Sequence, residues 1–398
     1  MAFGTLKRLL SACCLACKQR SAKDAWRLLR FRLSGGNMIT MRRKQNARWA
    51  YISYIPEAIV RNDPEFLNFH QNTREMKVIA DCFLNHGFNI VVQHYQSKIV
   101  PPPHEYDIIF GLEPNFVLCA EKHPDAKTVY YATGAYVGYA NRSIVQRTSQ
   151  FNSRYGTDIP PRRLAMDDGS AGKSDCILQI GTANTIETYP EAIQPKIRLI
   201  HQSSNLLSND FRRTGFKKTK FLWLGSSGSI LKGVDLVIEA FLRHPELEID
   251  IVGPVENEVK AVYARQLHNT SNIRFHGYVD VNSHRFMNIV SDTAFLIYPS
   301  VTEGGFPGAV IAGMKLGLVP LVSKIAAPEC IESCGYQLND ISLHSIEQAL
   351  QWSQNLSENQ IKERSDAVVQ YSTLFSIERF GQEFNRFLDD ICRTAASN

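Results

Sequence analysis

The sequence lacks the features that mark several large classes of protein. No apolar run approaches the about 18 to 20 residues that a helix needs to span a bilayer. The nine cysteines are not spaced as a disulfide framework, which excludes a small disulfide scaffold and favours reduced thiols. Cys14 and Cys17 have no second Cys or His pair at zinc spacing, and no Asp-x-Asp motif occurs. We therefore expect no bound metal and no resident cofactor.

Length and composition instead indicate two globular domains. The chain has 398 residues, 44% of them apolar and 21% charged, which suits about two domains of ordinary size, each with its own core. The net charge of +5 hides an asymmetry. Residues 1–50 hold 12 Lys or Arg and one acid, Asp24, so their charge is +11 and that of the remainder is −6. The first part of the chain therefore needs its own interpretation.

Residues 1–48 form a basic extension with apolar residues at helical spacing. A cationic amphipathic helix ending at Gly35 and Gly36 would lie on an anionic membrane surface, with Trp26 and Phe31 at the interface. A basic tail, or a helix that packs on the body of the protein, explains the same residues. No apolar core of a secretion signal precedes Cys13. We expect a cytoplasmic protein, and peripheral contact of residues 1–36 with the inner face of the plasma membrane is one hypothesis.

Residues 49–205 predict a first α/β domain. Short apolar runs alternate with helical patterns, of which residues 73–85 are the clearest, and such alternation is typical of a parallel, doubly wound sheet. The expected strands are residues 50–55, 88–92, 106–110, 127–131, 176–180 and 197–200. Residues 201–210, rich in Ser and Asn, are expected to link the two domains.

The loop after the strand at 127–131 is the predicted acceptor side of a ligand site. Ligands of such sheets bind beyond the carboxyl ends of the strands, which makes Thr133, Gly134 and Tyr136 the candidates in this domain. Tyr136 either contacts a sugar or packs inside the domain.

A polar helix over residues 141–155 and a proline-fixed turn at 160–163 follow this loop. Their basic side chains either meet an anionic acceptor, such as a lipid diphosphate, or lie on a solvated face. These residues are Arg142, Arg147, Arg154, Arg162 and Arg163.

Residues 206–374 predict a second α/β domain whose first loop offers hydrogen-bond donors to phosphates. A strand at 221–224 runs into Gly225, Ser226 and Ser227, and Lys232 precedes a helix at 234–242. A glycine and serine loop between strand and helix presents backbone N–H groups to phosphates, and the Lys adds a positive charge. The loop is neither a P-loop nor a Gly-x-Gly-x-x-Gly dinucleotide motif.

A second loop of this domain combines glycines with one acid. The apolar run 294–298 predicts a strand, and residues 309–316 predict a helix that ends at Gly317. Between them lie four candidate site residues, which are Glu303, Gly304, Gly305 and Gly308. The glycines allow close approach of a ligand, and the helix N-terminus favours an anion. A carboxylate repels a bare phosphate but accepts hydrogen bonds from hydroxyl groups, so a ligand with both sugar and diphosphate fits this loop.

These residues resemble the donor-site motif of retaining family 4 glycosyltransferases. The similarity covers Pro299-Ser300, Glu303-Gly304, and Met314 with Gly317. The second Glu of that motif is absent, because Ala312 stands two residues before Met314, and Glu303 lies one residue further from Met314 than is usual. In the earlier loop Lys232 matches the lysine of the family, whereas Ser226 stands where an Arg is common.

The resemblance implies a GT-B fold, in which two Rossmann-like domains face each other across a cleft. It implies that a final helix, within residues 375–398, crosses back to the first domain. Glu303 would orient a sugar hydroxyl and Lys232 would stabilise the departing diphosphate, both in catalytic roles. The loops after the strands at 248–252 and 273–275 would hold ribose and base, through Gly253, His276 and Tyr278. Alternatively, Tyr278 is a half-buried aromatic residue of the loop without contact to the ligand.

The implied function is transfer of a sugar from a nucleoside diphosphate sugar to a glycan or lipid-linked acceptor in cell-surface polysaccharide synthesis. The resemblance implies retention of configuration, and we expect neither a metal nor a nucleic-acid partner. Two alternatives stay open, and the first rests on three departures from the family: Ser226 replaces an Arg, Ala312 replaces a Glu, and the acceptor-side loop lacks the His that is common there. One is a weak or inactive GT-B scaffold that binds a nucleotide or glycan. The other is a sugar-nucleotide epimerase or hydrolase on the same fold.

Overall fold

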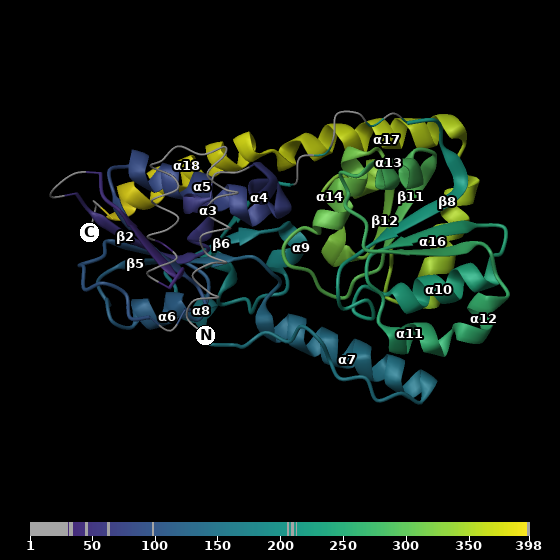
Figure 1. The fold of residues 1–398 in the computed structure, drawn as a ribbon, viewed down its shortest axis with the longest axis horizontal. Coiled ribbons are helices and arrows are strands. Elements are labelled where there is room, and N and C mark those ends of the chain that lie inside the picture. Colours follow the sequence, from purple (N-terminus) through teal and green to yellow (C-terminus); the bar gives the residue numbers. More distant parts are fainter. Residues whose placement is uncertain are drawn as a thin grey trace, which may run out of the picture. The chain divides into compact units, whose positions relative to one another are not determined.

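The computed structural model describes residues 31, 35–43, 47–61, 64–97, 99–204, 207, 211 and 213–395. Most of the basic N-terminal extension therefore lies outside the described residues. The chain divides into two compact units. Unit 1 comprises Met1–Ala132, Asp168–Leu178 and Ile377–Asn398, and unit 2 comprises Thr133–Asp167 and Gln179–Ser376 (Figure 1). The domain boundaries drawn from the sequence stay predictions.

The first sheet has seven strands in the order β1-β3-β2-β4-β5-β6-β7. The strands are β1 (Met38–Met41), β2 (Trp49–Tyr54), β3 (Asn89–His94), β4 (Ile108–Gly111), β5 (Lys127–Ala132), β6 (Cys176–Ile180) and β7 (Ile197–Ile200). The pairs that join β3, β2, β4 and β5 are parallel, as the alternation of strands and helices predicts. β1 pairs antiparallel with β3 and adds an edge strand that the sequence pattern does not reveal.

The last helix of the chain belongs to unit 1. Phe384 of α18 (Ile377–Ala395) is fully buried, and its ring contacts Phe83 of α5 (Gln71–Asn85) and Phe110 of β4. The chain thus returns to its first unit after it has completed the second, as the resemblance implies. The other helices of unit 1 are α3 (Glu57–Val60), α4 (Pro64–Phe69), α6 (Asn115–Ala120) and α8 (Ser170–Lys173).

The second sheet has six strands in the order β10-β9-β8-β11-β12-β13, and all its pairs are parallel. The strands are β8 (Lys217–Leu224), β9 (Glu248–Val252), β10 (Ile273–Gly277), β11 (Thr293–Tyr298), β12 (Val319–Val322) and β13 (Tyr336–Gln337). Counted from β8, this is the order 3-2-1-4-5-6 of dinucleotide-binding folds. The order reverses between β8 and β11, and ligands of such sheets bind beyond the strand ends at that point.

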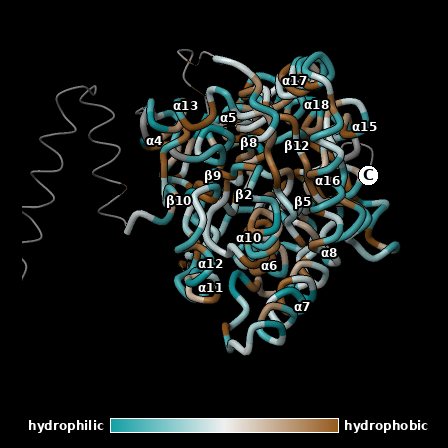
Figure 2. Tube along the Cα trace, turned by 90° about the vertical axis from the view of Figure 1, so that its right-hand side faces the viewer, coloured by the Kyte–Doolittle hydropathy of each residue, from teal (hydrophilic) through white to brown (hydrophobic). Residues whose placement is uncertain are grey.

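Helices cover both faces of this sheet, so its strands are buried on both sides. One apolar cluster joins Trp223 of β8 to Phe241 of α10 (Val234–Arg243) and Ile346 of α16 (Leu343–Asn355). The opposite cluster joins β8 to α13 (His284–Val290), α14 (Gly308–Lys315) and α17 (Glu358–Ser372). Burial on both faces explains why these strands read as continuous apolar runs. Figure 2 shows hydrophobic segments on the strands and hydrophilic ones on many loops and outer turns.

A long helix, α7 (Val137–Tyr155), also belongs to unit 2. Phe151 enters the same apolar cluster as Trp223, and Arg147 forms a buried ion pair with Asp235 of α10. The helix begins four residues before the predicted start at 141. The shorter elements of unit 2 are α9 (Ala183–Ile186), α11 (Asn257–Val262), α12 (Ala264–His268), α15 (Ile331–Cys334), η1 (Gln194–Lys196), η2 (Lys324–Ala326) and η3 (Thr373–Phe375).

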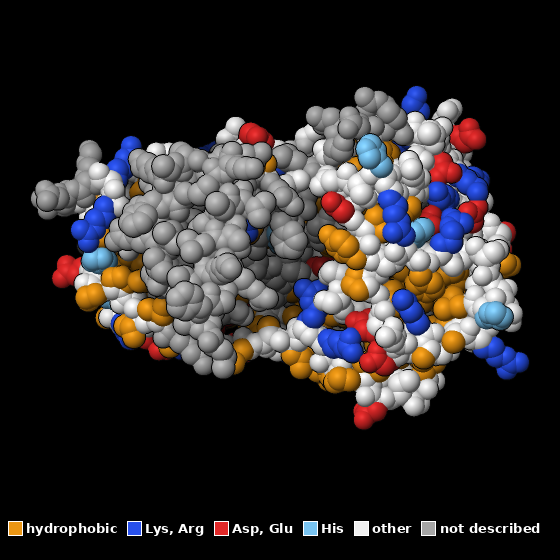
Figure 3. Space-filling model, in the orientation of Figure 1, with side chains coloured by type: hydrophobic (Ala, Val, Ile, Leu, Met, Phe, Trp, Pro, Cys, Tyr) orange, Lys and Arg blue, Asp and Glu red, His pale blue; other side chains and the backbone are white. Residues whose placement is uncertain are grey.

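The surface charges, the thiols and the helix lengths do not narrow down the function of the protein. Over unit 2, the face drawn in Figure 3 shows Lys and Arg side chains interleaved with Asp and Glu. Every cysteine in the described part of the chain is a free thiol. Within those same residues, no helix combines the length and the apolar character that a membrane crossing requires.

Candidate active site

Two loops of unit 2 meet where the strand order reverses. One loop follows β8 and the other follows β11, and the Val301 N–H donates to the Leu231 carbonyl at 2.9 Å. Gly233 has φ +67, and a Cβ atom there would lie 2.6 Å from the Pro299 carbonyl oxygen. Only glycine fits this left-handed, closely approached position. The two predicted donor loops are therefore joined by their backbones.

Lys232 lies at this junction and is 3% exposed. Its Nζ is 3.4 Å from the Ser227 carbonyl oxygen. Burial lowers the pKa of Lys232, and the opposite charge of Glu303 counteracts that effect. The two residues predicted as catalytic are thus close enough for their charges to act on each other. The ammonium is poorly solvated and would gain from an anionic ligand.

Glu303 is held by a buried tyrosine. Its Oε1 accepts a hydrogen bond from the Tyr298 hydroxyl at 2.8 Å, and Tyr298 is 1% exposed. Burial and the neighbouring carboxylate raise the pKa of Tyr298 well above its ordinary value, so the hydroxyl stays a donor. Among the described residues no hydrogen bond reaches the second oxygen of Glu303, which is therefore left for another partner. Tyr298 is a positioning residue that the sequence reading does not identify.

The predicted acceptor-side loop packs against the Glu303 loop. The Ala135 N–H donates to the Glu303 carbonyl at 3.0 Å, and a Cβ atom on Gly304 would lie 3.0 Å from the Thr133 carbonyl oxygen. A Cβ atom on Gly134 would lie 3.8 Å from the Cα of Gly304. The structure thus brings Thr133 and Gly134 beside Glu303 and Gly304.

Tyr136 makes packing contacts. Its ring lies 5.3 Å from that of Tyr189, and its N–H donates to the Thr188 hydroxyl at 3.0 Å. Of the two sequence interpretations for Tyr136, packing is the one for which the structure shows contacts.

Close glycine contacts also bring together the ends of β8, β9 and β10. A Cβ atom at Gly253 would lie 1.9 Å from the Gly225 carbonyl oxygen, so no other residue fits. The Gly253 N–H donates to the Gly277 carbonyl at 2.7 Å. Ser226 and Ser227 beside them are exposed, and their hydroxyls have no hydrogen-bond partner in the described structure.

A buried carboxylate occupies part of the predicted phosphate loop. Glu256 accepts hydrogen bonds from the N–H groups of Gly228 at 2.9 Å and Ser229 at 3.1 Å, and from the Ser229 hydroxyl. Although burial opposes ionisation, these hydrogen bonds lower the pKa of Glu256. The sequence analysis does not predict Glu256, an acid in the loop after β9, as a residue of this site. Within this loop, the side chains of Ser226, Ser227 and Lys232 stay available to a phosphate.

Arg163 supplies a second cation near Lys232. Its backbone has φ +69, which is uncommon for a residue other than glycine, and its side chain is exposed. Its Cδ would lie 3.2 Å from a Cβ atom on Gly228, and its charge acts on both Lys232 and Tyr298. In the described part of the chain Arg163 forms no ion pair. The segment is fixed by Asn141, which exchanges two hydrogen bonds with the Ala165 backbone.

His276 and Tyr278 differ in how firmly they are held. The His276 Nε2 lies 2.7 Å from Oδ1 of the buried Asp250 on β9, and Arg274 also donates to that carboxylate at 2.8 Å. Tyr278 is 78% exposed. No contact between described residues joins either side chain to Lys232 or Glu303. Their predicted role at the base and ribose stays a prediction.

The remaining predicted site residues are Gly305 and Gly308. Gly305 has φ +78, and a Cβ atom there would lie 2.5 Å from Ile180. Gly308 is exposed in the first turn of α14, where N–H groups have no acceptor inside the helix. Across the described residues, no group of three or more His, Cys, Asp or Glu side chains is placed to hold a metal ion.

The family match to known proteins lies entirely within unit 2. Residues 218–352 match the family described as Glycosyl transferases group 1. The chain carries a glycosyltransferase domain. The matched segment holds both Lys232 and Glu303, and the enzyme class that it indicates is glycosyltransferase. Curated protein sequences give no significant match.

Solved glycosyltransferase structures share the fold. HepE of Anabaena, solved with UDP-glucose, superposes with a TM-score of 0.54 at 11% identity, over 87% of this chain and 100% of that one. A glycosyltransferase of Rickettsia africae gives 0.53 at 13% identity, over 89% and 100%. WaaG, a glycosyltransferase involved in lipopolysaccharide biosynthesis, gives 0.51 at 15% identity, over 85% and 99%. The predicted fold class, with two Rossmann-like domains of GT-B type, is confirmed.

Proposed function

We propose that the protein transfers a sugar from a nucleoside diphosphate sugar to a hydroxyl group of a glycan or lipid-linked acceptor, with retention and without a metal. The observation that carries the proposal is the pair of backbone-joined loops at the point where the strand order reverses, one holding the buried Lys232 and the other Glu303. UDP is the first nucleotide to test, because the Anabaena HepE structure of the same fold contains UDP-glucose. Retention rests on the family 4 resemblance around Glu303 and Met314.

The chemistry assigns a part to each group. The acceptor oxygen bonds to the anomeric carbon, the bond from that carbon to the diphosphate oxygen breaks, and the acceptor proton leaves with the diphosphate or to solvent. Negative charge grows on the diphosphate, and Lys232 and Arg163 stabilise it. Glu303, oriented by Tyr298, accepts a hydrogen bond from a sugar hydroxyl and fixes the sugar for attack.

A panel of nucleotide sugars tests the donor, because a ligand that binds the folded state raises its thermal stability. We expect one UDP-sugar to raise the melting temperature and to release UDP when an acceptor is present. Lys232→Ala should weaken UDP binding roughly tenfold or more, the effect of losing a charge-assisted hydrogen bond. Glu303→Gln should lower turnover while UDP binding is kept. Unchanged UDP affinity of Lys232→Ala in calorimetry would contradict the role of this residue.

One observation favours a second candidate function. Glu256 already occupies the N–H groups of Gly228 and Ser229, which leaves fewer donors for a diphosphate. A protein that binds a nucleotide or glycan as a scaffold needs less charge stabilisation than an enzyme. Donor binding without release or transfer, over many acceptors, would favour the scaffold. Release of free sugar without an acceptor would instead favour a hydrolase.

We also propose that the basic extension contacts an anionic membrane, where a lipid-linked acceptor would be found. Its support is the charge of +11 over residues 1–50. Removal of residues 1–30 should abolish pelleting with phosphatidylserine vesicles and leave the melting temperature unchanged. The cut stops before Phe31, which is buried beside Val60 and Ile39. Pelleting of the shortened chain would refute the proposal.

A further inference from the structure

A cavity lies at the same edge of the second sheet, beside the start of the Glu303 loop. Its volume is about 320 Å³, within the range of small-molecule sites. One wall is formed by the segments that follow β11, β12 and β13, at residues 300–301, 323–325 and 338–341. These are again the carboxyl ends of parallel strands, where α/β sheets place their ligands. None of the predicted donor-binding residues lines this cavity, although Ser300 of the family-like motif does.

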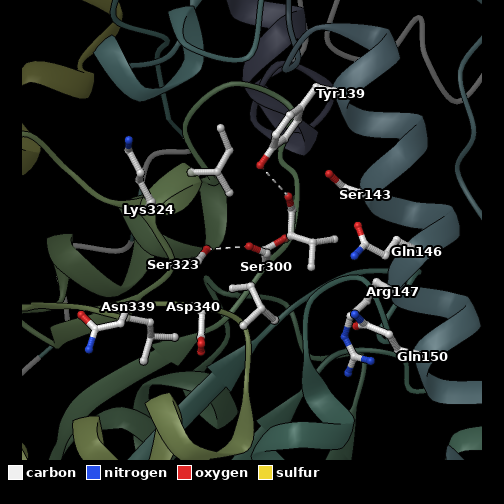
Figure 4. A pocket seen from close by; sticks show the side chains of 14 residues that line it. Tyr139, Ser143, Gln146, Arg147, Gln150, Ser300, Ser323, Lys324, Asn339 and Asp340 are labelled. Carbon is white, nitrogen blue, oxygen red and sulfur yellow. Dashed lines mark hydrogen bonds between the residues drawn. The ribbon is translucent and has the colours of Figure 1, made fainter.

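The opposite wall is one stripe of helix α7. Tyr139, Ser143, Gln146 and Gln150 follow one another at intervals of four, three and four residues, which places them on a single face. Figure 4 shows this stripe across the cavity from Ser300 and Ser323. The Tyr139 hydroxyl reaches the Val301 carbonyl at 3.5 Å, so this end of the cavity is narrow.

The other three polar side chains of the α7 stripe are unused. Ser143, Gln146 and Gln150 form no hydrogen bond with any other described residue, and both glutamines are exposed. An amide offers two donor hydrogens and an acceptor oxygen. Two amides and a hydroxyl that face one cavity can therefore bind adjacent hydroxyl groups of a ligand.

Two of the three charged side chains that line the cavity are paired with an opposite charge. Arg147 is paired with Asp235, and Lys324 is paired with Glu187. Asp340 accepts hydrogen bonds from the hydroxyls of Ser342 and Ser345. Asp340 keeps its negative charge, since hydroxyl donors lower its pKa and the described structure gives it no cation as a partner. Neither cation of the lining is spare, so an anionic ligand such as a phosphate or a carboxylate is disfavoured, and a neutral ligand whose hydroxyls can donate to Asp340 fits better.

Apolar side chains complete the wall. Val301, Ile325, Leu338 and Ile341 lie among the polar groups and offer surfaces for C–H groups. A neutral ligand that presents hydroxyls on its rim and C–H groups on its faces matches this mixture.

We propose that the cavity between α7 and the ends of β11, β12 and β13 binds a neutral saccharide unit. The choice of a saccharide over another polyol rests on the proposed function, since the donor and acceptor of that reaction carry sugars. Ser300 and Val301 line this cavity, and Glu303 follows them on the same loop. The bound sugar is therefore separated from the candidate active site by one short loop.

Saturation-transfer NMR on the full chain tests the proposal with glucose, galactose, N-acetylglucosamine, maltose, lactose and cellobiose as probes. At least one of these sugars should bind, and the double variant Gln146→Ala, Gln150→Ala should weaken it roughly tenfold or more, as expected for two lost hydrogen bonds. Alanine is the best helix former, so the variant keeps α7. The matched control is Gln266→Ala, Gln370→Ala, which removes two exposed helical glutamines outside the cavity.

UDP affinity, measured on the same samples, separates this proposal from the proposed function. Sugar binding that is lost in the cavity variant, kept in the control and accompanied by unchanged UDP affinity supports the cavity. The same loss of sugar binding supports the cavity even if UDP does not bind to any of the samples, but that result would contradict the donor proposal. Absence of binding for every probe, or binding that the cavity variant leaves intact, overturns the inference while leaving the donor proposal untouched.

Discussion

At the scale of single residues, Lys232 shows how a binding group can oppose stability. Its ammonium is almost completely buried, and burial outweighs the attraction of Glu303, so its pKa is lowered. A charge held out of water is favourable only once an anion joins it. The residue that serves the proposed reaction is thus costly in the free protein, as is common for functional sites.

Lys232→Met should therefore have two opposite effects. Without ligand, the unfolding free energy should rise by roughly 1 to 2 kcal/mol, because an apolar side chain of similar length replaces a buried charge. UDP affinity should fall roughly tenfold or more. Urea unfolding and calorimetry measure the two effects, with the exposed Lys362→Met as control. A variant that is less stable and binds UDP normally would show that Lys232 is structural.

Asp250 carries a pH dependence that can be isolated. Burial opposes its ionisation, but hydrogen bonds from Arg274 and His276 outweigh that and lower its pKa. The pKa of an Asp carboxyl in the unfolded chain is about 3.9. Below that pH the unfolded chain binds a proton at Asp250, whereas the folded chain stays ionised until a lower pH. The stabilisation is therefore complete above about pH 4 and is lost as pH falls through the folded pKa.

Asp250→Asn should remove this contribution. The difference in unfolding free energy between wild type and variant should be largest near pH 6 and should shrink below about pH 4. Urea unfolding at several pH values between 3 and 7 measures it, and the exposed Asp366→Asn provides the baseline. A difference that does not change over this range would mean that the Asp250 carboxylate is not the titrating group.

The sequence predicts some of the site residues and not their partners. Lys232 and Glu303 stand in loops whose glycines and neighbours mark them. Tyr298 ends a buried strand, and nothing local indicates that its hydroxyl reaches Glu303. Glu256 lies 27 residues after Ser229, the residue it binds. Such partners are set by the packing of separate strands, which no local pattern encodes.

At the scale of elements, the pattern of apolar residues predicts the limits of a strand well where apolar residues of the strand are buried. The predicted strands at 176–180, 197–200 and 248–252 have the same limits in the structure. The edge strand β1 was missed because it is short and only partly buried. The start of α7 at Val137 was missed because its N-cap residue, Tyr136, makes no side-chain capping bond.

The association of α7 with unit 2 rests on a contact between distant residues. Arg147 and Asp235 are 88 residues apart and both buried, and Arg147 donates to both carboxylate oxygens. Burial raises the pKa of Asp235 even with Arg147 beside it. Loss of the arginine would leave a buried carboxyl group without its counter-charge.

Arg147→Met should lower the unfolding free energy by about 3 to 5 kcal/mol at pH 7. The double variant Arg147→Met, Asp235→Leu should recover most of that loss, since paired apolar groups avoid the uncompensated charge. Urea unfolding measures both. As pH falls from 7 to 5, the single variant should recover relative to wild type, because protonation neutralises Asp235. A double variant as unstable as the single one would contradict this account of the pair.

At the scale of the whole molecule, the candidate site and the chain ends belong to different units. Every predicted site residue lies in unit 2, whereas the described start of the chain and helix α18 lie in unit 1. Length and the alternation of strands and helices are enough to predict two Rossmann-like domains. They do not reveal that residues 133–167 make their contacts within unit 2, since that depends on pairs such as Arg147 and Asp235.

This division predicts that the last helix can be damaged without loss of donor binding. Phe384 fills a buried aromatic cluster with Phe83 and Phe110, so Phe384→Ala should cost about 3 to 5 kcal/mol in unit 1. Phe387→Ala, at a half-buried position of the same helix, should cost less. Fluorescence-detected unfolding measures stability, and calorimetry below the transition measures UDP affinity. UDP affinity that falls with Phe384→Ala and not with Phe387→Ala would show that donor binding depends on unit 1.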